Sequence, residues 1–121
     1  MNTFLWVAQA ALAFIFLAHG LLFLFPPEAV REIKKQLSFP VGFMRFIYAA
    51  EILAAPGLTV PGLTGILPPL TPLAATGLAI IMGGATVFHL SRREVPPALV
   101  TAVLFALAVF VAFARWFVIP F

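Results

Sequence analysis

The sequence predicts an all-α integral membrane protein: a four-helix bundle with a short amphipathic interfacial helix between the first and second spans. Three observations predict this fold. The 121-residue chain is 64% hydrophobic and has only seven basic and four acidic residues, unlike a soluble domain. Four apolar runs each reach the roughly 20 residues that a helix needs to cross a bilayer core. None of these runs alternates apolar and polar residues, as a strand of a membrane barrel would.

Each run is expected to form one spanning helix of a single transmembrane domain, since a span must satisfy its own backbone hydrogen bonds. The expected helices cover residues 4–25, 43–63, 70–90 and 98–118. The first ends at Pro26-Pro27, because proline lacks the amide donor and disfavours helix in the residue before it. Its start has no Lys or Arg and its apolar run is longer than that of a signal peptide, so we expect a retained helix.

The segment 26–40 is the most highly charged part of the chain. Its apolar residues recur at helical spacing and its charged residues fill the other side: Val30, Ile33 and Leu37 against Arg31, Glu32, Lys34 and Lys35. This pattern is typical of a short helix lying in the headgroup region. A docking surface for anionic lipid or a partner and a plain solvated connector both fit the pattern.

The third expected span carries small residues at four-residue spacing, Ala75, Ala79 and Gly83. Such a ladder lets another backbone approach closely. Threonines in and beside the second and third spans are expected to be helix residues that bond to the backbone. They are Thr59, Thr64, Thr71, Thr76 and Thr86.

The distribution of Lys and Arg predicts the orientation. The first and third loops are basic, whereas the second loop and the N-terminal tail have no Lys or Arg. The positive-inside rule therefore places loops one and three in the cytoplasm and both termini outside, in a bacterial-type cytoplasmic (inner) membrane. Trp6 and Trp116 then share the outer leaflet, where indoles are enriched.

Glu51 lies near the middle of the second expected span, where a carboxylate is costly unless it is paired, hydrated or protonated. Arg45 precedes it by six residues, about 9 Å along the axis and about 120° around it, so the two cannot pair on one helix. We expect His19 of the first span to be the partner. The pair could be a titratable ligand site or a core contact that fixes helix register.

The predicted ligand-binding polar core comprises Glu51, Arg45, His19, Tyr48 and His89. A second polar pair, Gln9 and Arg115, shares the outer leaflet. We expect Arg115 to extend its head to the outer interface. The alternative is that it points inward, bonds Gln9 and recognises an anionic or carbonyl headgroup.

Several kinds of chemistry find no support in the sequence. There is no cysteine, which excludes disulfides and iron–sulfur ligation. No metal-binding His spacing, nucleophile–base arrangement or phosphate loop occurs, and the depth offset between His19 and His89 argues against haem. We therefore predict no metal, no catalytic residue and no intrinsic cofactor. The net charge of +3 comes from loops, so no nucleic-acid partner is expected.

The stretch 44–94 carries a recognisable pattern: Arg45 followed by Glu51, Gly57-Leu58, Pro72-Leu73-Ala74-Ala75, Gly77-Leu78 and His89. This pattern, with the closing VAFAR at 111–115, resembles the DoxX-like family of small four-helix membrane proteins. The chain departs from that family at Tyr48, where members often carry Gly, and at Phe23, where they often carry Lys. The resemblance implies a four-helix bundle associated with membrane oxidoreductase systems, since the namesake is a small subunit of a thiosulfate:quinone oxidoreductase.

Two functional hypotheses follow. The first is a non-catalytic accessory subunit of a larger quinone-linked redox or respiratory complex, or a homo-oligomer, with the small-residue ladder as its contact face. The second is a stand-alone binder or enzyme for a quinone, isoprenoid or lipid held in the bundle. Transport is a weaker third hypothesis, because a chain of this size would need a dimer to build a two-sided pathway.

Overall fold

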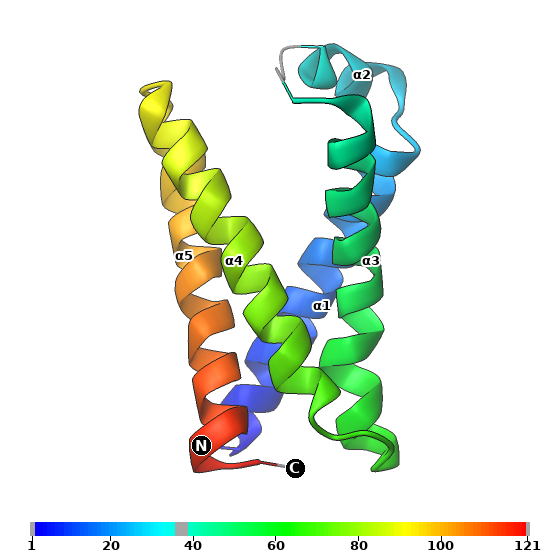
Figure 1. Cartoon of the computed structure of the whole chain (residues 1–121), viewed down its shortest axis with the longest axis vertical. Coiled ribbons are helices and arrows are strands. Elements are labelled where there is room, and N and C mark those ends of the chain that lie inside the picture. The colour runs from blue at the N-terminus through cyan, green and yellow to red at the C-terminus, as the bar shows by residue number, and fades with distance from the viewer. Residues whose placement is uncertain (1, 36–38, 121) are drawn as a thin grey trace.

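The computed structural model of the chain consists of helices joined by short connections (Figure 1). They are α1 (Asn2–Leu24), α2 (Glu28–Lys34), α3 (Val41–Thr64), α4 (Leu70–Ser91) and α5 (Val95–Phe113), which continues as a π-helical turn, η1 (Ala114–Val118). The structure describes residues 2–35 and 39–120, with only the backbone at position 34. The all-α prediction is confirmed, and the long helices lie within a few residues of their predicted ranges. Leu37, predicted on the apolar side of the interfacial helix, lies outside the described residues.

Within the described residues, α1, α3, α4 and the continuous α5–η1 segment are each long and apolar enough to cross a membrane. Their outward side chains are large and apolar. Phe14, Leu53, Ile80 and Phe117, one from each helix, are all more than 70% exposed. Such a surface is satisfied by lipid rather than water. The protein is therefore a multi-pass membrane protein in contact with the bilayer.

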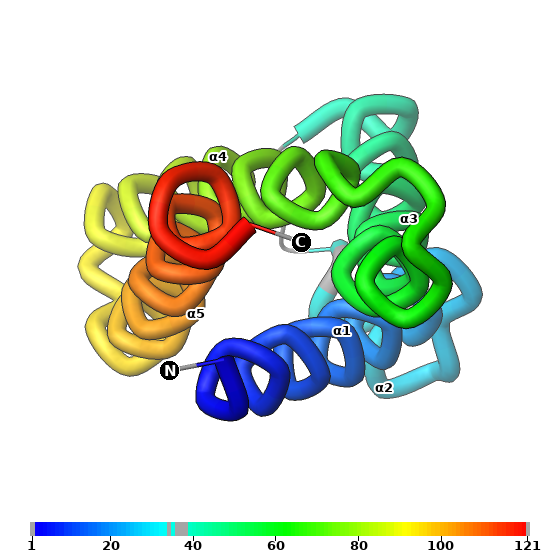
Figure 2. The backbone as a smooth tube through the Cα atoms, turned by 90° about the horizontal axis from the view of Figure 1, so that it is seen from below, coloured from blue at the N-terminus to red at the C-terminus, as the bar shows by residue number. Residues whose placement is uncertain are grey.

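The helices form two antiparallel pairs. α1 packs along α3, and α4 packs along α5, while α3 meets α4 less extensively. The two pairs lie close together at the end that holds both termini and diverge toward the end that holds α2 (Figure 1). Seen along the bundle, the order around the ring is α1, α3, α4 and α5 (Figure 2). The buried core is made of small and branched side chains from all four long helices.

A glycine brings α1 and α3 together. A Cβ built on Gly20 would lie 2.7 Å from Cγ1 of Ile52 and 2.8 Å from the carbonyl oxygen of Tyr48. Only glycine allows this approach, because real Cβ atoms essentially never come so close to other atoms. The close seam carries the neighbouring His19 toward α3.

A proline and a threonine join α3 to α4. Pro61 has no amide hydrogen, so the carbonyl of Gly57 loses its normal helical partner. The hydroxyl of Thr71 on α4 donates to that carbonyl at 2.9 Å, as polar side chains commonly do for proline-freed carbonyls in membranes. The prediction that Thr71 bonds to helix backbone is confirmed, with a carbonyl of the neighbouring helix as its acceptor. The prediction is confirmed for the other four threonines, which donate to carbonyls of their own helices.

The small-residue ladder on α4 is used inside the chain. Ala75 and Ala79 belong to the buried core. Gly83 faces α5, because a Cβ there would lie 3.3 Å from the ring of Phe105. The prediction that this ladder provides a contact face for a partner protein is wrong, since the neighbouring helices of the same chain already cover it.

Candidate functional site

Glu51 and His19 form a polar contact across the α1–α3 seam. Oε2 of Glu51 lies 2.7 Å from Nδ1 of His19. The glutamate side chain is only 1% exposed, whereas the histidine side chain is 43% exposed. The predicted contact is therefore present, and it joins a buried carboxylate to an imidazole that reaches the bundle surface. Its role in binding a ligand stays a prediction.

Two aromatic rings surround this pair. Tyr48 lies almost one helical turn before Glu51, is 2% exposed, and places its ring centroid 6.1 Å from that of His19. Phe23 stacks on His19 at a centroid distance of 4.3 Å and an interplanar angle of 21°. Phe23 was not among the predicted site residues, although its spacing of four from His19 puts both on one helix face. These four residues, His19, Phe23, Tyr48 and Glu51, are called the Glu51 site below.

The Glu51 site can hold one proton in more than one place. A carboxylate with an imidazolium and a carboxylic acid with a neutral imidazole differ only in the position of that proton. Either arrangement satisfies the buried carboxyl group, which would be strongly unfavourable as an isolated charge at this depth. The Nδ1 atom of His19 is used by Glu51, so a bound molecule would meet the Nε2 side of the ring.

Two residues predicted in the polar core lie outside the Glu51 site. Arg45 is exposed and lines a pocket with residues of α2, since the helical rotation from Glu51 points it to another side of α3. His89 is at the end of α4, which diverges from α1 and α3, and its Nδ1 lies 3.0 Å from Oε1 of Glu94. This hydrogen bond, supported by the nearby charge of Arg92, lowers the pKa of Glu94 below its usual value. The structure therefore separates His89 from the Glu51 site, whereas Arg45 borders that site, since Tyr48 lines the same pocket.

The second polar cluster lies at the end that holds the termini. Arg115 is 2% exposed, and its Nε donates to Oε1 of Gln9 at 2.7 Å. Nε2 of Gln9 donates to the carbonyl of Leu58 at 2.7 Å, and Nη1 of Arg115 donates to the carbonyl of Ile119 at 3.0 Å. The guanidinium carbon also lies 5.8 Å from the centre of the Trp6 ring.

The prediction that Arg115 extends to the outer interface is therefore wrong, and the inward alternative with its bond to Gln9 is correct. The physical reason is local. Arg115 lies in the π-helical turn η1, where an added residue per turn changes the direction of the side chain. Polar acceptors on α1 and near the C-terminus then offset the burial of its charge.

The described residues show two notable hollows. One, of about 320 Å³, lies under α2 and is treated below. The other is an apolar groove of about 630 Å³ between α3 and α4, lined by residues that include Leu53, Pro56 and Leu73. No group of three or more His, Asp or Glu side chains in the described part of the chain is arranged to hold a metal ion.

The chain matches the family model described as the DoxX-like family over residues 7–111. The matched region includes every residue of the Glu51 site and ends before Arg115. No curated protein and no solved structure matches the chain significantly. Because the match covers most of the sequence, the protein belongs to the DoxX-like family.

Proposed function

We propose that this protein is an accessory subunit of a quinone-linked redox system in the membrane, and that the Glu51 site binds the quinone headgroup. The observation that carries the proposal is the buried Glu51 carboxyl group at 2.7 Å from a half-exposed imidazole within the spanning region. Burying such a pair in a bilayer has a high free-energy cost, so a functional role is the default hypothesis. We further propose that both termini lie outside and the α2 end faces the cytoplasm, as the Lys and Arg distribution favours.

The chemistry of the site fits a quinone. A quinone headgroup is a flat ring with carbonyl oxygens that accept hydrogen bonds and, on reduction, take up protons. His19 can donate a hydrogen bond through Nε2, and Glu51 can keep or return the proton at Nδ1. The stacked ring of Phe23 and the ring of Tyr48 offer flat apolar surfaces beside the imidazole.

An accessory role follows from what the chain can hold. It has no cysteine, and no metal-binding cluster is formed by the residues that the structure describes. In this proposal, electrons for a bound quinone come from another protein. The exposed apolar faces of the spanning helices remain for contact with such a partner, since the small-residue ladder is covered.

The second candidate function is a stand-alone binder or enzyme for a small hydrophobic molecule. The apolar groove between α3 and α4 favours it, because a groove of about 630 Å³ could hold part of an isoprenoid or acyl chain. This function would need no partner protein.

The test is a purification of the tagged full-length protein in mild detergent, with proteins and quinones identified together by mass spectrometry. The proposed function predicts a redox protein and a quinone in the wild-type sample. Glu51→Gln keeps the size of the side chain but removes its proton chemistry, so the quinone should fall at least severalfold. Glu94→Gln is the matched control, because it makes the same change in the other His–Glu pair.

The outcomes separate the two candidates. Quinone without a partner, lost on Glu51→Gln, would favour the stand-alone binder. Equal quinone in the wild type and in Glu51→Gln would show that the Glu51 site does not bind it. Purification of the protein with neither a quinone nor a redox partner would contradict the first candidate.

A further inference from the structure

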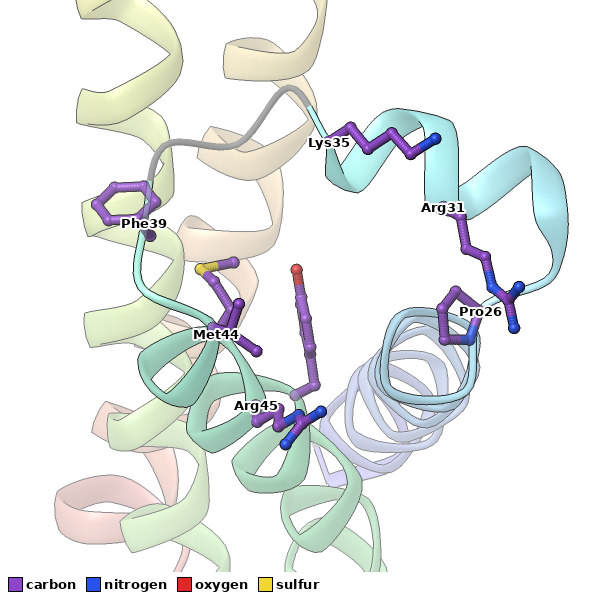
Figure 3. A pocket seen from close by; sticks show the side chains of 8 residues that line it. Pro26, Arg31, Lys35, Phe39, Met44 and Arg45 are labelled. Carbon is purple, nitrogen blue, oxygen red and sulfur yellow. The ribbon is translucent and has the colours of Figure 1, made fainter.

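A cationic pocket lies where α1 ends, α2 crosses and α3 begins. It has a volume of about 320 Å³. Arg31 on α2 and Lys35 directly after α2 border it from one side, and Arg45 and Met44 on α3 border it from the other (Figure 3). Two helices that are separated in sequence therefore bring three cations to one hollow at the end of the spanning region.

Carboxylates do not neutralise this pocket from within. None of the acidic residues in the described ranges lines it. Glu32 does pair with Lys35 at 3.0 Å, but both side chains are about two-thirds or more exposed, so the pair lies in solvent and contributes little. No ion pair is found for Arg31 or Arg45 among the described residues. The pocket therefore has a net positive charge and fits an anion.

Another edge of the pocket, at the start of α3, is apolar and open to the lipid-facing surface. Phe39, Val41 and Met44 line this edge. Val41 is 66% exposed and Phe39 is 40% exposed. Phe39 also contacts Phe88 at a centroid distance of 5.0 Å, which ties this edge to the end of α4. A ligand that fills the pocket would thus meet cations on one side and a path for apolar chains on the other.

We infer that this pocket binds the phosphate headgroup of an anionic phospholipid, with the acyl chains lying over Phe39 and Val41. Arginine is suited to the phosphate oxygens, because its planar guanidinium can donate two parallel hydrogen bonds. Basic pockets between spanning helices are a general means of holding anionic lipid headgroups. A free phosphate would contact only the cationic side of the pocket. The apolar edge therefore favours a lipid over a free phosphate. The inference does not depend on the proposed role of the Glu51 site.

The experiment uses the purified full-length protein in a neutral detergent. Binding of phosphatidylglycerol is titrated by native mass spectrometry, with phosphatidylcholine and glycerol phosphate as separate arms. Each lost cation should weaken phosphatidylglycerol binding about fivefold. Arg31→Gln and Arg45→Gln are therefore each expected to raise Kd by that factor. The double variant should raise Kd by roughly 25-fold if the two arginines act independently. Arg93→Gln is the matched control, since it removes one charge from the other loop at the same end of the bundle.

The inference is supported if the two pocket variants weaken binding while Arg93→Gln does not, and if phosphatidylcholine and glycerol phosphate compete poorly. Both arginines are exposed, and unchanged helical circular dichroism would show that the variants fold. Equal affinity of wild type and double variant would overturn it. So would an equal loss in Arg93→Gln, which would indicate unspecific charge attraction, or competition by glycerol phosphate as strong as that of the lipid.

Discussion

Gly20 on α1 lies against the backbone of Tyr48 on α3, so that a Cβ at position 20 would come within 2.8 Å of the Tyr48 carbonyl oxygen. That oxygen belongs to a helix backbone and cannot move aside as a flexible side chain could. The adjacent His19 reaches Glu51 at 2.7 Å only across this seam. Gly20 therefore sets the spacing of the two helices that form the Glu51 site.

Gly20→Ala should accordingly separate α1 from α3. Overpacking of this kind costs about 1–3 kcal/mol, and the displaced imidazole should lose its bond to Glu51. Unfolding in a denaturing detergent would measure the free-energy change. Gly77→Ala is the control, because a Cβ there meets nothing within 4 Å, and it should be neutral or slightly stabilising. Equal stability of the two variants would contradict the proposed role of Gly20.

Thr71→Val should destabilise the contact between α3 and α4. The substitution leaves the carbonyl of Gly57 without the hydroxyl donor that replaces the missing amide hydrogen of Pro61. We expect a loss of about 1–2 kcal/mol, the upper part of the range for single side-chain hydrogen bonds in membranes. The same unfolding measurement applies.

Thr59→Val is the matched control for this prediction. Thr59 donates to the carbonyl of Ala55, but that carbonyl keeps its ordinary partner in the helix, the amide of Thr59 itself. Its loss should cost only a few tenths of a kcal/mol. A similar effect of the two substitutions would mean that the Gly57 carbonyl is satisfied in another way.

The Glu51–His19 contact could be predicted from the sequence because it depends only on the depth of the two residues in the membrane and on the free-energy cost of burying a carboxylate. A buried carboxylate must have a partner, and a single histidine lay at a compatible depth on the first span. Depth also suggested His89 as a member of the core, but the structure places it at the end of α4 beside Glu94. Depth in the membrane does not reveal that the two helix pairs diverge. The separation of α4 from α1 at the α2 end depends on how the helices pack along their whole length.

The direction of Arg115 and the acceptor of Thr71 could not be taken from depth either. Extension to the interface is the usual solution for an arginine near a helix end, but the π-helical turn that redirects Arg115 has no clear sequence signal. For Thr71 a signal did exist. Pro61 frees the carbonyl of Gly57, and a freed carbonyl requires a donor from a neighbouring helix. Counting the carbonyls that prolines leave unpaired could have predicted the α3–α4 bond.

Gln9→Leu should destabilise the protein through Arg115. The substitution removes the acceptor at 2.7 Å from Nε of a guanidinium that is 2% exposed. Hydrogen bonds to charged groups contribute about 1.5–3 kcal/mol, and a buried charge without its partner is especially costly. We expect a loss in that range, measured as the free energy of unfolding in a denaturing detergent.

A double-mutant cycle tests whether this effect passes through the pair. Replacing both partners by apolar groups is often nearly neutral, so Gln9→Leu combined with Arg115→Met should be more stable than Gln9→Leu alone. Simple additivity of the two single changes would show that Gln9 and Arg115 do not act together.

The contact between His89 and Glu94 should make the α4–α5 connection sensitive to acid. The hydrogen bond from His89 lowers the pKa of Glu94 below its usual value of 4.5, against a smaller opposing effect of desolvation. A carboxyl group with a lowered folded pKa stabilises the fold fully above the pKa that it has when unfolded. That contribution is lost as the pH falls through the lower, folded pKa, because protonation removes the charged acceptor. Hydrogen exchange at residues 89–95, expressed as protection relative to the intrinsic rate at each pH, should therefore lose protection below about pH 4.5 in the wild type. Glu94→Gln should exchange faster at neutral pH and lose this acid dependence, and His89→Asn should weaken the dependence because it removes the main cause of the pKa shift.

An unchanged acid dependence in Glu94→Gln would assign it to another group.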